Sequence, residues 1–182
     1  MNKLIVLFFL ILFPFVSWAG NPEEDQEYLL QKRQAGKLKI GMSADELYKN
    51  YEKKLTKRVD LKIEGHYCPA IEINLQNKET QKPSLIAEIT QEDKWTVWRI
   101  RVYDSRFKTD KGIGVGSTLG DIRKFYKVFW QACGEQVLCA YVKDIQMSFV
   151  IDSAFPGKRP EKDDPVLLPD DIIVSSIQIS GR

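Results

Sequence analysis

An internal repeat constrains the fold of this chain more than any other feature of its sequence. The segment KIGMSADELYKNY (Lys39–Tyr51) aligns with GVGSTLGDIRKFY (Gly114–Tyr126) at a single offset of 75 positions. Many matches at one fixed offset indicate a duplicated structural unit. The aligned pairs are Ile40 with Val115, Gly41 with Gly116, Ser43 with Thr118, Glu46 with Asp121, Leu47 with Ile122, Lys49 with Lys124 and Tyr51 with Tyr126.

Each copy of the repeat carries the signature of a helix N-terminus. The side-chain oxygens of Ser43 and Thr118 are suited to accept hydrogen bonds from free amides of a first helical turn. Glu46 and Asp121, three positions further on, are the reciprocal partners of a capping box. The glycine before each cap lets an extended chain turn into the helix. The repeat therefore predicts two equivalent capped helices.

The same segment resembles a phosphate-binding loop, but its spacing excludes one. In KGIGVGSTLGDIRKFY no lysine follows Gly116, as the Walker pattern requires. The third glycine of a dinucleotide-binding pattern would fall on Ser117 or Leu119. The formal net charge of +2 also provides no basic stripe for nucleic acid. We expect neither nucleotide nor nucleic-acid binding.

Alternating apolar and polar residues predict several strands after each helix. We expect an α+β fold of two tandem repeats, each a capped helix followed by an antiparallel β-meander, with the helices packed on the sheet. Residues 20–110 would hold the first repeat and an additional helix from Asn21 to about Gly36, and residues 111–182 the second. The predicted strands are Val59–Ile63, Ile71–Leu75, Leu85–Ile89, Trp98–Val102, Val137–Val142, Met147–Ile151 and Ile173–Ile179.

Residues 1–19 have the layout of a secretory signal peptide. Lys3 provides a positive start, an apolar run extends from Leu4 to Val16, and Ser17-Trp18-Ala19 places small residues at the cleavage positions. The run is shorter than the roughly 20 apolar residues of a membrane span. We expect cleavage before Gly20 and an exported protein, periplasmic or extracellular, with no integral span; an uncleaved anchor is the alternative.

Export would expose the three cysteines to oxidising conditions, in which disulfides persist. The segment CGEQVLC brings Cys133 and Cys139 close enough to close a hairpin, so we expect a disulfide between them. A bridge to Cys68 is equally permitted by the count. One thiol is left over in either case, and Cys68 is the simplest choice.

The arrangement of an extended entry, Gly-Met-Ser or Gly-Ser-Thr, a helix and a meander resembles known exported proteins. It is similar to the unit found once in BamE-type accessory proteins of outer-membrane assembly and twice in the β-lactamase inhibitory proteins. The run RIRVYDSRFKTDKGIGVGSTLGDIRKFY also resembles an uncharacterised family of secreted bacterial proteins. The resemblance implies a two-repeat α+β fold and an envelope or extracellular setting, and it carries no activity.

Catalytic and metal-binding patterns are weak in this sequence. His66 and Cys68 would point to one side of a strand and suggest a thiol-dependent hydrolase or transferase as the alternative function. Their side chains would stand about 7 Å apart at their bases, which is poor geometry for proton transfer. One histidine and scattered cysteines give no zinc spacing. We expect a non-enzymatic protein without cofactor or metal.

The segment KWTVWRIRVY holds the candidate binding residues. Alternation predicts Trp98, Ile100 and Val102 on the core face of a strand. The outer face would then hold Trp95, Val97, Arg99, Arg101 and Tyr103. Arginine and aromatic residues are enriched at binding hot spots. We therefore predict a surface that binds a protein or another envelope component; an ordinary cross-strand charge ladder that includes Glu88 is the alternative. The residues predicted to bind the partner are Trp95, Arg99, Arg101 and Tyr103.

Overall fold

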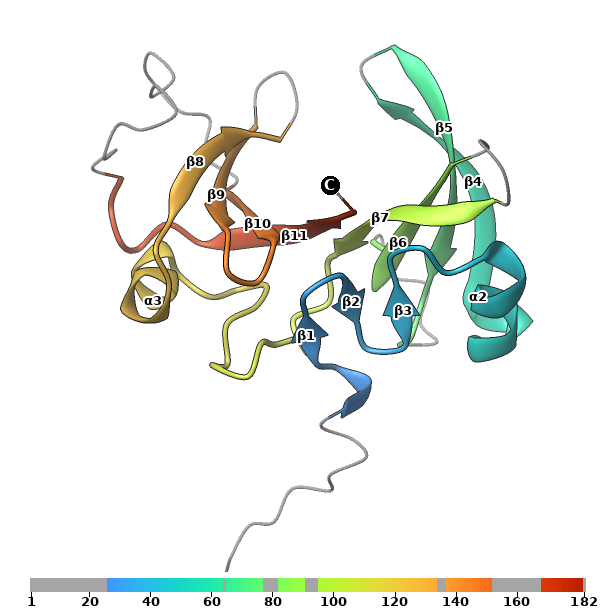
Figure 1. The fold of residues 1–182 in the computed structure, drawn as a ribbon, viewed down its shortest axis with the longest axis horizontal. Coiled ribbons are helices and arrows are strands. Elements are labelled where there is room, and N and C mark those ends of the chain that lie inside the picture. Colours follow the sequence, from blue (N-terminus) through green and yellow to red (C-terminus); the bar gives the residue numbers. More distant parts are fainter. Residues whose placement is uncertain are drawn as a thin grey trace, which may run out of the picture.

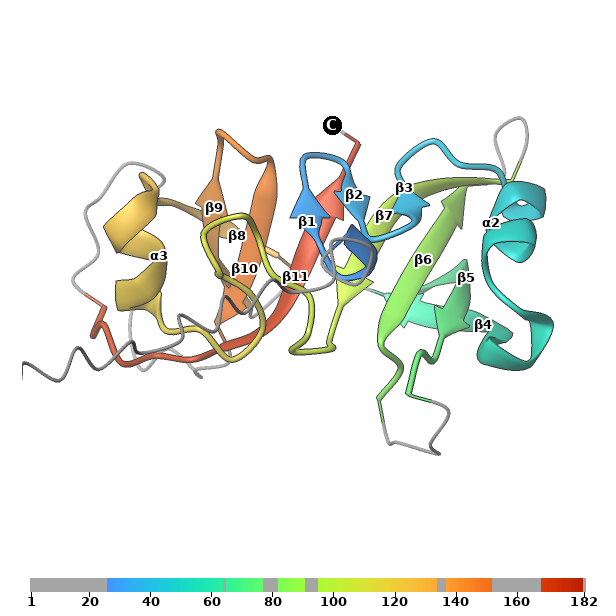
Figure 2. The ribbon, with the colours of Figure 1, turned by 90° about the horizontal axis from the view of Figure 1, so that it is seen from below.

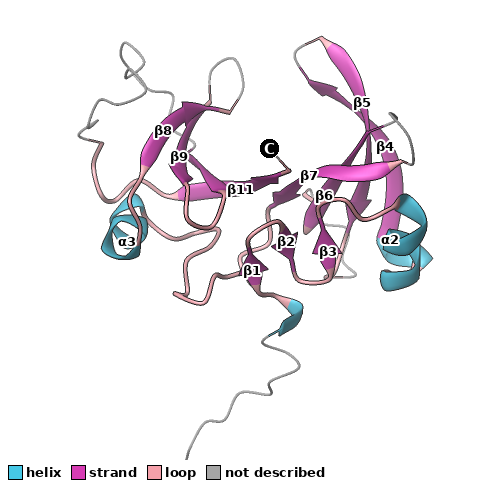
Figure 3. Cartoon of the chain, viewed as in Figure 1, coloured by secondary structure: helices cyan, strands magenta, loops and turns pink. Residues whose placement is uncertain are grey.

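The protein is mostly β-structure, built around one large antiparallel sheet (Figures 1 and 3). We describe a computed structural model for residues 26–63, 65–76, 82–90, 95–133, 137–151 and 168–181. The sheet has eight strands in the order β4-β5-β6-β7-β11-β10-β9-β8. Their bounds are β4 (Thr56–Ile63), β5 (His66–Ile73), β6 (Leu85–Thr90), β7 (Thr96–Val102), β8 (Phe129–Ala132), β9 (Leu138–Val142), β10 (Met147–Ile151) and β11 (Val174–Ser180).

The last strand of the chain completes the centre of this sheet. β11 pairs with β7, with Ile177 opposite Val102 and Ile179 opposite Ile100, so that β4 and β8 are the two edges. A second, three-stranded sheet consists of β1 (Leu30–Gln31), β2 (Gln34–Ala35) and β3 (Leu38–Lys39). The helices are α2 (Ala44–Asn50) and α3 (Leu119–Phe125), with a 3-10 turn η1 at Lys53–Leu55.

The helices and the small sheet cover one face of the large sheet. In Figures 1 and 2 the two helices lie at opposite ends of the molecule, with β1 to β3 between them, and the edges of the large sheet curl away from them. Leu38 of β3, Leu47 of α2 and Ile122 of α3 are fully buried against apolar residues of the strands. We call this covered side the core face and the opposite side, around which the sheet curls, the inner face.

The predicted α+β fold of two tandem helix-and-meander repeats is wrong. Strands dominate, the helices have seven residues each, and one sheet of eight strands continues through the chain. The two helix starts were identified correctly, but each helix ends after about two turns, where Tyr51 and Tyr126 are already extended. A cap signature locates where a helix begins and contains no information on its length.

Both predicted capping boxes are confirmed. The Ser43 hydroxyl accepts from the Glu46 amide, and the Thr118 hydroxyl accepts from the Asp121 amide. Each carboxylate in turn accepts from the backbone amide of its cap residue. The glycine at position 116, with φ of 85°, belongs to the turn that leads into α3. The glycine-rich segment is therefore the start of a helix.

The predicted helix between Asn21 and Gly36 is too long: within the described residues only Gln26 and Glu27 are helical. Residues 30–39 form the three short strands β1 to β3, because Leu30, Ala35 and Leu38 pack into the core as an antiparallel ribbon. Tertiary burial outweighs the local cap signal here. The seven predicted strands are present as β4 to β7 and β9 to β11, whereas β8 was not predicted.

The predicted signal peptide, residues 1–19, lies outside the described residues. Within the described part of the chain, no helix is long and apolar enough to cross a membrane. The boundary predicted near residue 110 falls in the segment between β7 and α3. One continuous sheet joins the strands on either side of that segment.

Candidate functional site

A β-bulge in β7 separates the predicted binding residues into two groups. Arg99 lies opposite Glu88, whereas Val97 lies opposite Ile89, so that Trp98 is an extra residue in β7. The bulge shifts the alternation by one position. Val97 points into the core, and Trp98, predicted for the core, is only half-buried.

The first group surrounds a buried carboxylate on the inner face. Glu88 is 0% exposed, and its Oε2 accepts from Arg99 Nε at 2.8 Å and Nη2 at 2.6 Å. Its Oε1 accepts from Arg101 Nε at 2.5 Å. The side chains of the two arginines are only 19% and 21% exposed. Arg101 also donates to the side chain of Tyr103.

This buried cluster changes the interpretation of Arg99 and Arg101. We expected both guanidinium groups to be accessible, and that expectation is wrong, because both compensate a carboxylate that has no contact with water. The guanidinium carbon of Arg99 also stacks 4.3 Å from the centre of the Trp98 ring. A cross-strand charge pair of the kind predicted as the alternative is present between Arg99 and Glu88, near the centre of the large sheet, with Glu88 itself fully buried.

Cys68 borders the same cluster. Its Sγ lies 4.0 Å from Glu88 Oε2, and it is the free cysteine among the three. Burial, and after it the charge of Glu88, raises the pKa of the Cys68 thiol. His66 is exposed at the first residue of β5. These surroundings disfavour the thiolate that the alternative enzymatic function would need.

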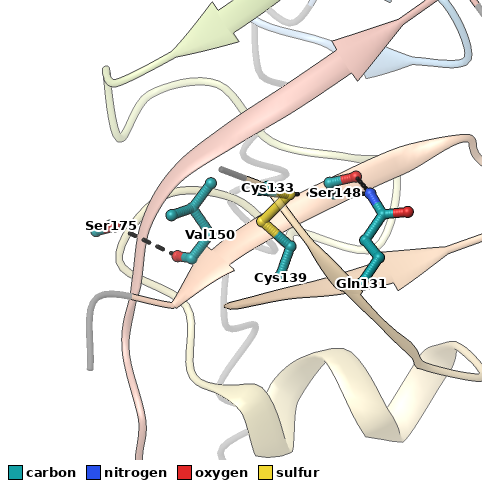
Figure 4. The surroundings of a disulfide bond; sticks show 6 residues. All are labelled: Gln131, Cys133, Cys139, Ser148, Val150 and Ser175. Carbon is teal, nitrogen blue, oxygen red and sulfur yellow. Dashed lines mark hydrogen bonds between the residues drawn. A yellow bond between two sulfur atoms is a disulfide. The ribbon is translucent and has the colours of Figure 1, made fainter. Parts of the chain in front are cut away.

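The predicted disulfide between Cys133 and Cys139 is confirmed (Figure 4). It joins the residue that follows β8 to β9, at one edge of the large sheet. Gln131 of β8 donates to the Ser148 hydroxyl of β10 at 2.5 Å, and Figure 4 shows this contact beside the bridge. The disulfide thus holds an edge strand of four residues against its neighbour.

Trp95 belongs to a different place, a pocket on the core face beside α2. The pocket has a volume of about 520 Å³. Pro69, Ile71 and Ile89, from β5 and β6, form its apolar floor. We call it the Trp95 pocket; its lining residues are Ser43, Ala44, Asp45, Tyr48, Arg58, Pro69, Ala70, Ile71, Ile89 and Trp95.

Large aromatic side chains are exposed at and near this pocket. Trp95 is 41% exposed and Tyr48 of α2 is 43% exposed. Tyr67, which precedes Pro69 by two residues and therefore points to the same face of β5, is 73% exposed. Three of the six exposed large apolar residues of the described chain thus lie in one region of the surface.

The backbone holds Trp95 in place at a cost in conformational energy. Its φ of 38° lies in the left-handed region, which is a genuine outlier for a bulky residue. Its carbonyl accepts from the Ala44 amide at 2.9 Å, and the Val97 amide donates to Met42 at 2.8 Å. Strained residues persist only where the surrounding structure fixes them, and they cluster at functional sites.

The segment paired with the start of α3 repeats the backbone hydrogen bonds that hold Trp95 beside α2. Its side chains show that these hydrogen bonds do not require an exposed aromatic residue. At α3 the Leu119 amide donates to the Ile172 carbonyl at 2.8 Å, and Val174 donates to Ser117 at 2.9 Å. Ile172 occupies the place of Trp95 in this pattern, but it packs against the core. Of these two equivalent positions, Trp95 is exposed and Ile172 is half-buried.

Arg58 forms the last wall of the Trp95 pocket. Its guanidinium carbon lies 4.4 Å from the centre of the Trp95 ring, a cation–π contact. Because Arg58 belongs to β4 and Trp95 precedes β7, their side chains meet above β5 and β6. Sequence reasoning selected Trp95 and missed Arg58 and Tyr48, since only the folded sheet and α2 bring them together.

Comparison with known proteins identifies a similar fold and no function. No protein-family model matches the sequence, and no curated protein matches it significantly. The crystal structure of the uncharacterised protein YfeY from Escherichia coli is similar, with a TM-score of 0.52 and 17% sequence identity. The match covers 85% of this chain and 99% of that chain. At this identity the likeness supports the fold alone.

Proposed function

We propose that this protein is an exported, non-enzymatic binding protein that recognises a polypeptide partner through the Trp95 pocket. The observation that carries this proposal is an exposed tryptophan with a left-handed backbone, stacked with an arginine above an apolar floor. Tryptophan, tyrosine and arginine are the residues most enriched among binding hot spots. An exposed apolar surface costs solubility, so its presence favours a partner that covers it.

The chemistry of the other surface groups supports binding over catalysis. Within the described residues, no group of three His, Cys, Asp or Glu side chains is arranged to hold a metal ion. Burial, and after it the neighbouring carboxylate of Glu88, raises the pKa of the Cys68 thiol, the opposite of an activated nucleophile. We therefore keep the thiol-dependent hydrolase or transferase as a hypothesis without a supporting contact.

An exported setting agrees with the covalent structure. A disulfide between Cys133 and Cys139 is compatible with an oxidising compartment, in which such bonds persist. The finer assignment, cleavage before Gly20 and release into the periplasm or the medium, rests on the sequence of residues 1–19.

Photo-crosslinking tests the proposed function in cells that produce the protein. A benzophenone amino acid replaces Tyr67, which is exposed beside the Trp95 pocket, or Phe125, which is 54% exposed on α3 and serves as the matched control. We expect a light-dependent adduct with a second protein from position 67, lost when Trp95→Ala is added, and none from position 125. An adduct that persists in the Trp95→Ala background, or no adduct from position 67, contradicts the proposal.

A further inference from the structure

Arg58 differs from the other arginines of the described chain in what its guanidinium contacts. Arg33 donates to the Gly181 carbonyl, and Arg99, Arg101, Arg106 and Arg123 each donate to a carboxylate. Among the described residues, Arg58 has a ring contact with Trp95 and no carboxylate within ion-pairing distance. An arginine has five donors, and stacking on a ring uses none of them.

The other charged residue of the pocket has a structural explanation. Asp45 lies in the first turn of α2, where the free amides and the helix dipole stabilise a carboxylate. The strand that carries Arg58 is basic: β4 holds Lys57, Arg58 and Lys62 against Asp60. Three cations against the single carboxylate of Asp60, which shares the face of Arg58, leave β4 with a net positive charge, and this favours a negatively charged partner.

The position of Arg58 also indicates the kind of molecule that would supply the negative charge. β4 is an edge of the large sheet, and no described strand pairs with its outer side. An edge strand presents unpaired backbone N–H and C=O groups, which an extended polypeptide can satisfy. Next to this edge, the floor formed by Pro69, Ile71 and Ile89 accepts an apolar side chain.

Resting on the proposed function, we propose that the partner segment carries an aspartate or glutamate beside an apolar residue. The carboxylate binds the outward N–H groups of Arg58, and the apolar side chain enters the Trp95 pocket. Stacking on Trp95 fixes the plane of the guanidinium and presents its edge, the geometry that suits a two-point contact with a carboxylate. A lysine has neither the plane nor the paired donors.

A random heptapeptide library displayed on phage tests this inference on the protein purified after export. Peptides are selected on the wild-type protein and counter-selected on Trp95→Ala. We expect the enriched sequences to share an acidic residue next to a leucine, isoleucine, valine or aromatic residue. The enriched peptide is then synthesised with acetylated and amidated ends, so that its acidic side chains carry its only negative charge, and its affinity is measured by calorimetry.

We expect Arg58→Gln to weaken this peptide at least about tenfold, the loss typical of one charge-assisted hydrogen bond. Changing the peptide's acidic residue to its amide should cause the same loss, and the two changes together should cost no more than either alone. Lys57 directly precedes Arg58 in β4 and points to the inner face of the sheet, away from the Trp95 pocket. Lys57→Gln is therefore the matched control and should change affinity less than about twofold.

The outcomes separate the two proposals. Enriched peptides that need Trp95, but lack acidic residues or tolerate Arg58→Gln, overturn the carboxylate inference and leave the proposed binding function standing. A selection that yields no Trp95-dependent peptide overturns both. Equal losses from Arg58→Gln and Lys57→Gln would show only a general effect of charge, which also contradicts a defined contact at Arg58.

Discussion

Two arginine–tryptophan stacks of almost equal geometry lie on opposite faces of the large sheet. The guanidinium carbon of Arg99 is 4.3 Å from the Trp98 ring centre, and that of Arg58 is 4.4 Å from the Trp95 ring centre. Arg99 is bound to a fully buried Glu88, whereas Arg58 has no described carboxylate partner. The stack alone therefore does not identify a recognition site. What distinguishes the two stacks is whether the remaining donors of the guanidinium already bind a carboxylate of the described chain.

The two stacks therefore have different roles, one structural and one available for binding. The stack of Arg99 and Trp98 belongs to the interior, because its arginine offsets the charge of Glu88. In the stack of Arg58 and Trp95 the donors remain unused within the described chain and the ring is exposed. The following predictions test this division, from the largest expected effect to the smallest.

Removal of Glu88 should destabilise the protein most. Glu88→Ala leaves two largely buried guanidinium groups beside each other without a counter-charge, and we expect a loss of about 3 kcal/mol in the free energy of unfolding. Urea unfolding followed by circular dichroism measures it. Glu72→Ala, which changes a half-buried carboxylate on the same face, should cost about 0.5 kcal/mol. A loss below about 1 kcal/mol for Glu88→Ala would contradict the structural role of the cluster.

Truncation of Trp95 should weaken recognition more than any other single change in the pocket. We expect Trp95→Ala to cost about 2 kcal/mol or more in binding free energy, a roughly thirtyfold rise in Kd, because hot-spot aromatic residues contribute most. The selected peptide and calorimetry provide the measurement. Phe125→Ala, an exposed aromatic residue on α3, is the control and should leave Kd unchanged. Similar losses from both variants would remove the distinction between the two ends of the molecule.

The two helix caps should have equal effects on stability and unequal effects on binding. Ser43→Ala and Thr118→Ala each remove the acceptor of a capping box, so each should cost about 0.5 to 2 kcal/mol in the free energy of unfolding. Of the two caps and their helices, Ser43 and α2 line the Trp95 pocket, and Thr118 and α3 do not. We expect Ser43→Ala alone to weaken the peptide a few-fold, and the same weakening in Thr118→Ala would argue against the assigned pocket.

The left-handed backbone of Trp95 should produce a difference in stability between its glycine and alanine variants. Glycine adopts a φ of 38° without strain and alanine does not, so we expect Trp95→Gly to be about 1 kcal/mol more stable than Trp95→Ala. Both variants should bind the peptide at least about thirtyfold more weakly than the wild-type protein. If alanine is the more stable of the two in thermal and urea unfolding, the strained conformation is not present in solution.

Cys68 should react slowly with alkylating reagents. Because burial and Glu88 raise the pKa of its thiol, the thiolate forms only at a higher pH than in a free cysteine, for which the pKa is about 8.5. Glu88→Gln removes one of these causes and should raise the alkylation rate at pH 8 several-fold, as followed by mass spectrometry. A thiol that reacts faster than free cysteine at pH 7 would revive the alternative enzymatic function.

The sequence contained the local features of this structure and lacked the long-range ones. The capping boxes, seven of the strands and the Cys133–Cys139 pair depend on short-range patterns, and these predictions are confirmed. The fold class was wrong because helix length and the joining of all eight strands into one sheet depend on tertiary packing.

The candidate site shows the same limit more sharply. Strict alternation assigned Arg99 and Trp95 to one surface, and this was wrong. The extra residue at the bulge, Trp98, places the residues before it on the opposite face from the one that alternation predicts. Bulges carry no strong sequence signal, and the meeting of Arg58 with Trp95 across β5 and β6 depends on strand order. The choice of aromatic and arginine residues could be made from sequence, and their grouping could not.

The most direct test of the central claim is the free energy of unfolding of two arginine variants measured side by side in urea. The account predicts that Arg99→Ala loses about 2 kcal/mol or more, because Glu88 remains buried with only Arg101 as a counter-charge. It predicts that Arg58→Ala loses no more than about 1 kcal/mol, the value of an exposed cation–π contact. Equal losses, or a larger loss for Arg58→Ala, would contradict the division between a structural stack and a stack available for recognition.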